Sequence, residues 1–411
     1  MAFAHNRRGF NFKTSTLLWN ALGGLGERWR MLDRILADRG HHDRVLDKAV
    51  STIRGHNVLH PFWYYQDGWG DVSIANSFYN WLDSLQKEIK AQTDQSKIWT
   101  PRKMAIDFGP EMIHDEGFKT QEGRFTTSSL EISHLLPKES VQGRALFVSP
   151  TNIPIELADT KPTVILLAGT GEHGYGRRTS SMAIPLALRA GISSVVLESP
   201  FYGSRRPPNQ VGSKLRRVSD LAVLGRVTIE ETCSLLKHLS EEQGVKNMAV
   251  AGISMGGLHS AMTASVYSGS VGVVSWLGPP SAAPVFTEGL LSRFCEWKRL
   301  QTEIGNGALA KDVMNRFLCL TNIDNFPRPV DPSRGIFVIA EHDMYVPTEF
   351  SVSKWNSLQQ EKWMGSRVEV IPGGHVSAIL FGGPTMRKCV EYVLGVRKED
   401  PFKESATRMP S

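Results

Sequence analysis

An alternation of short apolar runs with stretches of helical length, starting at about residue 110, is the feature that most constrains the fold of this chain. Short, continuously apolar runs are typical of strands that are buried on both faces. Their alternation with helices indicates the α/β class, a mostly parallel central sheet with helices on both faces. Strands are predicted at 130–136 and 144–148, as an antiparallel opening pair, and at 164–167, 194–197, 248–251, 271–277, 336–340 and 368–371. The predicted helices are 179–190, 219–243, 255–267, 349–361 and 384–394.

Residues 1–105 have a different pattern, which predicts an N-terminal helical extension. Two sets of apolar residues recur at helical spacing. One comprises Leu25, Trp29, Leu32 and Leu36, and the other Ile74, Phe78, Trp81, Leu82, Leu85 and Ile89. The aromatic run PFWYYQDGWG at 61–70 lies between them. Lipid contact is one interpretation of this run, but we favour packing against the main domain, because aromatic rings stabilise proteins mainly through burial.

The α/β domain is predicted to span 106–396, followed by a disordered tail at 397–411. The connection from 278 to 334 is too long for a plain crossover between strands. Ligands of open α/β sheets bind outside the carboxyl ends of the strands. We therefore expect this segment to form a small, lid-like helical insertion at that edge.

Composition excludes several classes of protein. With 41% hydrophobic and 21% charged residues, the 411-residue chain is like ordinary globular proteins. No apolar run reaches the roughly 18 residues of a membrane-spanning helix, so a span is not expected and only a peripheral membrane contact stays open. Four scattered cysteines without a CxxC pair predict neither a zinc site nor a disulfide framework. A net charge of +6 without a binding motif predicts no nucleic-acid partner.

The N-terminal 26 residues contain Arg7, Arg8 and Lys13 and no acidic residue. This pattern is compatible with a mitochondrial transit peptide and equally with a plain basic N-terminus. Cysteines without a disulfide framework favour a reducing compartment. We therefore expect an intracellular protein, in the cytoplasm or the mitochondrion.

A candidate nucleophile lies in the run MAVAGISMGG at 248–257, which places Gly252-x-Ser254-x-Gly256 between a predicted strand and a predicted helix. A serine at a sharp strand-to-helix turn has a strained backbone, and small neighbours are needed for the turn to close. Its hydroxyl then projects into the cleft. The amide of Met255, at the start of the helix, points to the same space and can hold an oxyanion.

The base and the acid that such a serine needs follow in the order typical of α/β-hydrolases, Ser then Asp then His. Asp343 follows a buried strand in GIFVIAEHDMYVP, and His375 follows the next strand in VEVIPGGHVSAI. Because parallel strands end at the same edge of a sheet, both side chains are expected beside Ser254. The sequence therefore predicts a Ser-His-Asp triad.

Other residues could fill these roles. His259 lies one helical turn beyond the serine, and we interpret it as a packed helix residue. His342 precedes the proposed acid and is expected to face solvent. Asp324 and Asp331 lie in the insertion, but neither follows a clear strand.

The run VILLAGTGEHG at 164–174 contains Gly169-x-Gly171-x-x-Gly174 after a predicted strand, and Glu198 ends the next strand. Taken alone, this pattern also fits a dinucleotide site, with Glu198 on the ribose. A hydrolase needs a second oxyanion amide from the loop at this position, and Thr170 is the natural donor. Because a dinucleotide enzyme would leave the triad order unexplained, we favour the oxyanion hole.

Basic residues follow the same loops, at Arg177, Arg178, Arg205 and Arg206. Lys214, Arg216 and Arg217 come soon after them. These loops border the catalytic edge, so the four arginines are candidates for binding an anionic substrate. Solvated arginines without a ligand are the alternative.

Several runs together resemble the α/β-hydrolase domain-containing protein 18 family, over roughly residues 110 to 395. They are LLAGTGEHGYGRR, LESPFYGSRRP, VSDL, GISMGGLHSAM, VFTEGLLS, AEHDMYVP and GGHVSAILF. The resemblance implies a serine hydrolase with Ser254 as nucleophile, Asp343 as acid and His375 as base. It also implies a lipid-type acyl ester as substrate, with a mitochondrial phospholipid as one candidate.

The sequence thus predicts an α/β-hydrolase that cleaves a carboxylic ester through an acyl-enzyme, with no metal and no organic cofactor. An acyltransferase or a peptidase would use the same triad on the same fold. A dinucleotide-dependent oxidoreductase and a binding protein with a vestigial triad are further alternatives.

Overall fold

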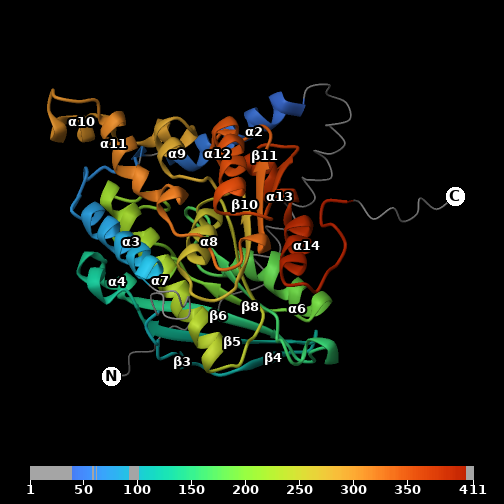
Figure 1. The fold of residues 1–411 in the computed structure, drawn as a ribbon. Helices are drawn as coiled ribbons and strands as arrows, with labels where there is room; N and C mark the ends of the chain where they lie inside the picture. Colours follow the sequence, from blue (N-terminus) through green and yellow to red (C-terminus); the bar gives the residue numbers. More distant parts are fainter. Residues whose placement is uncertain (1–38, 58–59, 62, 92–100, 404–411) are drawn as a thin grey trace, which may run out of the picture.

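The computed structural model describes residues 39–57, 60–61, 63–91 and 101–403. Its centre is a ten-stranded sheet in the order β12-β11-β10-β9-β7-β8-β6-β5-β3, with β4 also paired to β5 (Figure 1). The strands are β3 (Asp107–Phe108), β4 (Met112–His114), β5 (Phe118–Thr126), β6 (Gln142–Pro150), β7 (Thr163–Leu167), β8 (Ser193–Leu197), β9 (Met248–Ile253), β10 (Gly272–Trp276), β11 (Gly335–Ala340) and β12 (Arg367–Ile371). Pairing is parallel along the order β8-β7-β9-β10-β11-β12. It is antiparallel between β8 and β6, between β6 and β5, and between β5 and each of β3 and β4. The predicted α/β architecture is confirmed.

Helices cover both faces of the parallel strands. α7 (Val218–Glu241), α8 (Met255–Val266) and α12 (Thr348–Glu361) pack on one face, and α6 (Ile184–Ala190), α13 (His375–Phe381) and α14 (Gly383–Val393) on the other (Figure 1). Within β7, Ile165 and Leu167 belong to the first core, whereas Val164 and Leu166 belong to the second. Side chains alternate between the faces of a strand, so a strand buried on both faces has to be apolar throughout.

The N-terminal segment contributes α2 (Arg39–Gly55), the short pair β1 (His56–Asn57) and β2 (His60–Pro61), and α3 (Ile74–Ala91). The helix that we predict around Leu25 to Leu36 lies outside the described residues. The aromatic run is buried, with Tyr64, Tyr65 and Trp69 at 2%, 0% and 7% exposure. Tyr64 and Tyr65 contact the ring of Phe286, which confirms the packing interpretation.

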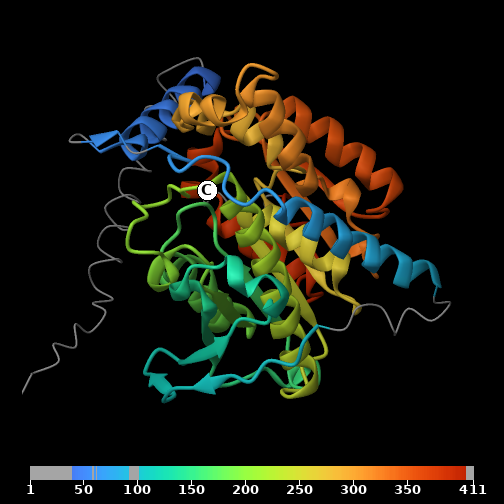
Figure 2. The ribbon, with the colours of Figure 1, turned by 90° about the vertical axis from the view of Figure 1, so that its left-hand side faces the viewer.

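Residues 278–334 form a cluster of short helices: α9 (Ala283–Thr287), α10 (Trp297–Ile304), α11 (Ala310–Leu318) and the 3-10 turns Leu290–Phe294, Cys319–Thr321, Ile323–Asn325 and Pro332–Arg334. Figure 2 shows this cluster in orange beside the dark blue α2. Tyr64 donates its amide hydrogen to the Phe294 carbonyl at 2.7 Å, so this cluster is tied to the N-terminal segment. A lid-like movement of the cluster stays a prediction.

The predicted strand at 130–136 is wrong, because this segment is the 3-10 helix Leu130–Leu135. Ile132 in this helix and Leu136 directly after it are buried, four residues apart, while Leu130 is 51% exposed. The antiparallel partner of β6 is instead β5. The sequence of β5, FKTQEGRFT, has few apolar residues because much of the strand is only half-buried, so apolar runs could not reveal it.

Part of the tail that we expected to be disordered has a defined structure. Arg397 makes an ion pair with Glu391, and Asp400 pairs with Arg367 at 3.1 Å. The guanidinium of Arg367 also lies 5.3 Å from the ring centroid of Phe402. These contacts hold residues 397–403 against the sheet.

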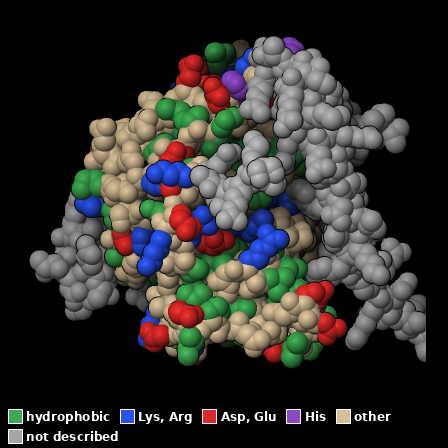
Figure 3. Space-filling view, turned by 90° about the vertical axis from the view of Figure 1, so that its right-hand side faces the viewer, with side chains coloured by type: hydrophobic (Ala, Val, Ile, Leu, Met, Phe, Trp, Pro, Cys, Tyr) green, Lys and Arg blue, Asp and Glu red, His purple; other side chains and the backbone are tan. Residues whose placement is uncertain are grey.

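The described helices include none with the combination of length and apolarity that crossing a bilayer requires. On the described part of the face seen in Figure 3, Lys and Arg side chains are interspersed with Asp and Glu. The positive net charge of the chain is therefore not gathered into one patch on that face.

Candidate active site

Ser254 lies at the turn between β9 and α8, with φ 56° and ψ −119°. A non-glycine residue with positive φ is strained, and such strain is concentrated at functional sites. Its amide donates to the Trp276 carbonyl at 2.8 Å, and its carbonyl accepts from Gly257 and Leu258 at 2.9 and 3.2 Å. The neighbouring strand and the first turn of the helix thus hold the serine in this conformation.

The two glycines of the predicted turn are required by close backbone contacts. A Cβ on Gly252 would lie 2.3 Å from the Gly256 carbonyl carbon, and a Cβ on Gly256 would lie 2.7 Å from the Leu167 carbonyl oxygen. Both distances are far below van der Waals contact. The glycines therefore let helix α8 begin directly against β7 and β9, which is the sharp turn that exposes the serine hydroxyl.

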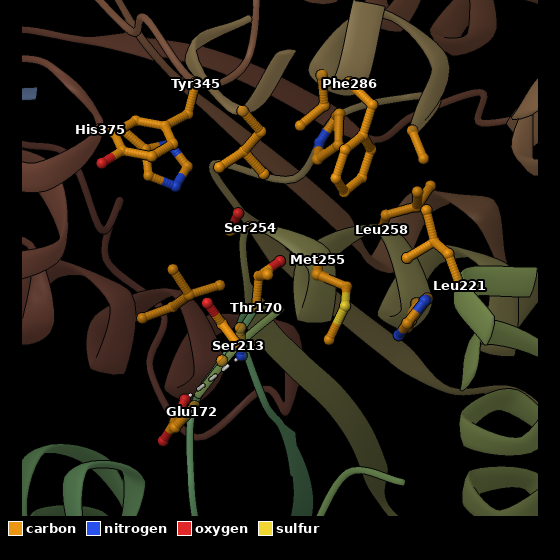
Figure 4. A pocket seen from close by; sticks show the side chains of 18 of the residues that line it. Thr170, Glu172, Ser213, Leu221, Ser254, Met255, Leu258, Phe286, Tyr345 and His375 are labelled. Atoms are coloured by element: carbon orange, nitrogen blue, oxygen red, sulfur yellow. Dashed lines mark hydrogen bonds between the residues drawn. The ribbon is translucent and has the colours of Figure 1, made fainter. Parts of the chain in front are cut away.

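The predicted acid and base are in direct contact. Asp343 Oδ2 lies 2.6 Å from His375 Nδ1, and both side chains are buried. Asp343 Oδ1 accepts hydrogen bonds from the amides of Tyr345 and Val346, each at 2.8 Å. With Nδ1 committed to the carboxylate, Nε2 is the ring nitrogen left for proton transfer. Figure 4 shows the imidazole and the Ser254 hydroxyl facing the same cavity, which both residues line.

The rival residues do not take these places. Asp324 pairs with Lys354 at 2.5 Å, and Asp331 accepts from the Ser333 hydroxyl. His259 is buried in α8 as expected, but it also lines the cavity, and burial lowers the pKa of its imidazole to about 4. The ring of His342 packs against α2 at Gly40 rather than facing open solvent.

The glycine loop after β7 borders the cavity through Gly169, Thr170 and Gly171. Gly171 has φ 73°, and a Cβ there would lie 2.3 Å from Ser213 Cβ, so the loop depends on glycine at this position. Met255 is the first residue of α8, where amides lack an intrahelical acceptor. Thr170 and Met255 both line the cavity together with Ser254, and their role as oxyanion donors stays a prediction. Glu198 is buried, accepts from the Ser204 amide at 3.0 Å, and does not line the cavity.

The cavity has a volume of about 440 Å³ and a mostly apolar lining, typical of small-molecule sites. Three parts of the chain form it: the α/β domain, the 278–334 cluster and the N-terminal segment. Its apolar lining includes Phe78, Leu221, Leu258, Met262, Val285, Phe286, Leu291, Ile379 and Leu380 (Figure 4).

The four candidate arginines differ in their surroundings. Arg205 is fully buried and pairs with Glu231 through two hydrogen bonds, at 2.7 and 2.8 Å. Arg178 is buried and donates to the Leu166 and Leu197 carbonyls, both at 2.6 Å. Neither guanidinium can reach a substrate, so the prediction is wrong for these two residues. Arg206 is half-buried and does not line the cavity, whereas Arg177 does.

Arg177 shares its partner Glu172 with Arg178. Although burial opposes it, the two guanidiniums hold the pKa of the Glu172 carboxyl below its usual value. Arg177 therefore already has an ion-pair partner at the cavity wall, which it shares with Arg178. Spacing along the sequence could not reveal this pairing, because Glu172 appears there only as part of a glycine loop.

Lys214 is the basic residue that lies in the cavity without a counter-charge. Its side chain is 8% exposed, and the described residues give Nζ neither a hydrogen bond nor an ion pair. Nζ lies 4.4 Å from the Tyr64 ring centroid and 5.0 Å from that of Phe294. Burial lowers the pKa of this ammonium group to about 8. The sequence placed Lys214 near the cleft, but nothing in it distinguished this lysine from its basic neighbours.

Metal binding has no support from the described part of the chain, where no three His, Cys, Asp or Glu side chains are grouped as metal ligands would be. The four cysteines are free, and three of them are buried.

The sheet topology and the serine at the strained strand-to-helix turn define an α/β-hydrolase fold. Within this fold, the chain belongs to the family described as alpha/beta hydrolase domain containing 18, whose model matches residues 63–315 and 306–395. The resemblance seen in the sequence is thereby confirmed, and the match also includes part of the N-terminal segment.

Two solved structures with the same fold are acetyl xylan esterases. The chain is similar to acetyl xylan esterase 1 from Thermoanaerobacterium sp. JW/SL YS485, with 15% identity and a TM-score of 0.52, over 80% of this chain and 96% of that chain. It is similar to the acetyl xylan esterase from Paenibacillus sp. R4, with 14% identity and a TM-score of 0.52, over 80% and 98%. At such identities the likeness shows the fold alone.

Proposed function

We propose that the protein is a serine hydrolase that cleaves a carboxylic ester of a lipid-type substrate through an acyl-enzyme. The observation that carries this proposal is the placement of Ser254, strained at its turn, on the same cavity as the buried His375–Asp343 pair. Family membership and fold support it. A hydrolase of this kind needs no metal or organic cofactor.

In the proposed acylation step, Ser254 Oγ attacks the ester carbonyl while His375 Nε2 accepts the hydroxyl proton. The amides of Thr170 and Met255 stabilise the oxyanion that forms on the carbonyl oxygen. Each such donor typically contributes about 100- to 1000-fold to the rate. The imidazolium then donates its proton to the departing alkoxide oxygen, so an alcohol leaves and the acyl group stays on the serine.

Deacylation repeats these steps with water as the nucleophile. His375 accepts a proton from water, the resulting hydroxide attacks the acyl carbonyl, and the serine oxygen leaves with the proton that the imidazolium returns. Asp343 stabilises the charged imidazole in both halves of the reaction and keeps its Nδ1 hydrogen oriented. A carboxylic acid is released and the free serine is restored.

The lining of the cavity supports an apolar acyl group as the substrate part next to the serine. Phe78, Leu221, Met262 and Phe286 lie on this lining, and burying an alkyl chain against them contributes about 0.8 kcal/mol per CH₂ group. We therefore expect kcat/KM to rise with acyl length until the cavity is filled.

Lys214 supports an anionic group elsewhere on the same substrate. A buried ammonium group without a counter-charge is unfavourable, and an incoming carboxylate or phosphate relieves that state. Among the candidate cations this lysine, rather than the four arginines, meets the requirement, with Arg177 nearby but already paired. The proposed substrate thus combines an apolar acyl chain with an anionic group.

Hydrolysis of a fluorogenic acyl ester by matched variants tests the proposed function. We expect Ser254→Ala to lower kcat by about 10⁶-fold and Asp343→Asn by about 10⁴-fold, with unchanged circular dichroism. Thr263→Ala in α8 serves as the control, because it removes a buried hydroxyl from the same helix without touching the triad. Normal turnover by folded Ser254→Ala would refute the mechanism. Adding a competing alcohol and measuring ester product separates hydrolase from acyltransferase.

A further inference from the structure

Helix α2 brings a second buried carboxylate to the His375–Asp343 pair. Asp47, near the middle of α2, is 0% exposed. Its Oδ2 accepts from the amides of Met344 at 3.1 Å and His375 at 3.0 Å, and its Oδ1 accepts from the Val376 amide at 2.8 Å. One side chain therefore joins the loop that carries the acid to the loop that carries the histidine.

Further contacts hold α2 at this place, and they pack it beside α13 at the top of Figure 1. The Ser377 hydroxyl donates to Asp43 Oδ1 at 2.7 Å, one helical turn from Asp47. A Cβ on Gly374 would lie 3.0 Å from Asp47 Oδ2 and 3.1 Å from the Asp43 carbonyl oxygen, so glycine at 374 permits the close approach of the helix. The position of Asp47 is thus fixed by its own helix and by the loop that it contacts.

We propose that Asp47 is a positioning residue for the reaction, which holds the backbone at His375 and Met344 so that the imidazole keeps its alignment with Ser254. This inference rests on the proposed function of the site. Asp47 touches neither the substrate nor the reacting atoms, and it acts through His375.

Two physical effects follow from its three hydrogen bonds. Charge-assisted bonds from amides to a carboxylate are short and strong, so they restrict the loop on which the base depends. A shift of about 1 Å in a catalytic group can lower the rate by about 100-fold. In addition, Asp47 interacts electrostatically with His375, so its negative charge favours the imidazolium formed during the reaction.

The ionisation of Asp47 suits this role. Burial raises the pKa of its carboxyl, while the amide of Val376 and the imidazole of His375 oppose the rise. Since both oxygens accept from amides, the carboxylate form matches the site. Among the described residues, the titratable and charged groups around His375 are Asp343 and Tyr345 from the loop after β11, Asp43 and Asp47 from α2, and Tyr64, Glu172, Arg177, Lys214 and His259 along the cavity.

The test compares Asp47→Asn with Asp43→Asn in the full chain, using a neutral fluorogenic ester. In Asp47→Asn, one amide oxygen can keep the bonds to Met344 and His375, but the amide nitrogen then faces the Val376 N–H and the negative charge is lost. We expect kcat to fall about 10- to 100-fold with KM unchanged. The acidic limb of kcat/KM against pH should move to lower pH, because losing a nearby negative charge disfavours the protonated imidazole.

Asp43→Asn is the matched control, since it lies on the same helix and contacts Ser377 rather than His375. Its amide oxygen can still accept from the Ser377 hydroxyl, so we expect a kcat close to that of the wild type. We expect a shift of the acidic limb smaller than that of Asp47→Asn, because the His375 and Met344 amides donate to Asp47 rather than to Asp43. If Asp47→Asn lowers only the melting temperature, with kcat and pH profile of the folded protein unchanged, Asp47 is merely structural and the proposal is overturned.

Asp47→Glu decides the question if Asp47→Asn does not fold. It keeps the charge and shifts the oxygens, so we expect a lowered kcat with the acidic limb at its wild-type pH, and a wild-type kcat would overturn the proposal. Failure of the proposed function is recognised separately: the wild type itself would then not hydrolyse the ester, or Ser254→Ala would hydrolyse it equally well.

Discussion

Two groups of basic side chains lie near the cavity, and they differ in what surrounds each charge. Arg205 and Arg178 are buried, and each guanidinium donates to several acceptors, for Arg205 including both oxygens of Glu231. Lys214 is also buried, yet its Nζ lies beside the rings of Tyr64 and Phe294 and near the Cys295 thiol, and the described residues give it no carboxylate partner. The comparison teaches that a basic residue beside a catalytic loop is a binding candidate only when its charge still lacks a partner.

The largest expected effect concerns the stability contributed by the paired group. Replacing Arg205 by Met leaves the Glu231 carboxylate buried without its partner, which typically lowers the free energy of unfolding by about 3–5 kcal/mol. Urea denaturation measures this change. The double variant Arg205→Met/Glu231→Met should recover much of the loss because neither charge is then buried alone. A stable Arg205→Met protein with lost turnover would instead make Arg205 a substrate ligand.

The next effect concerns binding by the unpaired group. Lys214→Met keeps the aliphatic bulk and removes the charge. Hydrogen bonds to charged groups contribute about 1.5–3 kcal/mol, so kcat/KM for an acyl ester bearing a carboxylate should fall about 10- to 100-fold. A matched neutral amide of that ester should be hydrolysed at the wild-type rate. Equal losses for both esters would place Lys214 in packing rather than in anion binding.

A smaller effect is expected from pH, without any mutation. Because burial lowers the pKa of Lys214 to about 8, its charge is present below pH 8 and is lost as the pH rises through that value. KM for the anionic ester should therefore increase between about pH 7 and 9, and KM for the neutral ester should not. The Lys214→Met variant should show no such difference between the two esters. A pH-independent KM ratio in the wild type would contradict this assignment.

The smallest effect is expected at Arg206, which is half-buried and outside the cavity. Arg206→Ala should change the free energy of unfolding by no more than about 0.5 kcal/mol. Its kcat/KM for the anionic ester should match that of the wild type within about twofold. Steady-state kinetics on the carboxylate ester checks this, and a loss as large as that of Lys214→Met would return the anion site to the arginine loop.

The parallel part of the fold could be predicted from the sequence because its strands are buried on both faces. The runs at 164–167, 248–251 and 336–340 fall within β7, β9 and β11. The antiparallel edge was harder, since β5 is largely polar and the apolar residues at 130–136 pack as a 3-10 helix. Helix α13 was also missed, because the residues after His375 form an apolar run too short to distinguish a helix from a strand.

The sequence could place Ser254, Asp343 and His375 on one edge of the sheet because each follows a recognisable strand. It could not reveal Asp47, which is 328 residues from His375 along the chain and lies in a helix without a motif. Nor could it separate Lys214 from the arginines, because partners such as Glu172 and Glu231 are determined by tertiary packing. What local pattern and strand order determine can be predicted, whereas the pairing of distant charges cannot.

The most direct measurement is covalent labelling with a fluorophosphonate probe followed by mass spectrometry of the modified peptide. A nucleophilic serine with a functional base forms a phosphonyl adduct, so the wild type should carry the label on Ser254, and Ser254→Ala should carry none. Absence of labelling in folded wild-type protein, or an adduct on another serine, would contradict the assignment of Ser254 as the nucleophile.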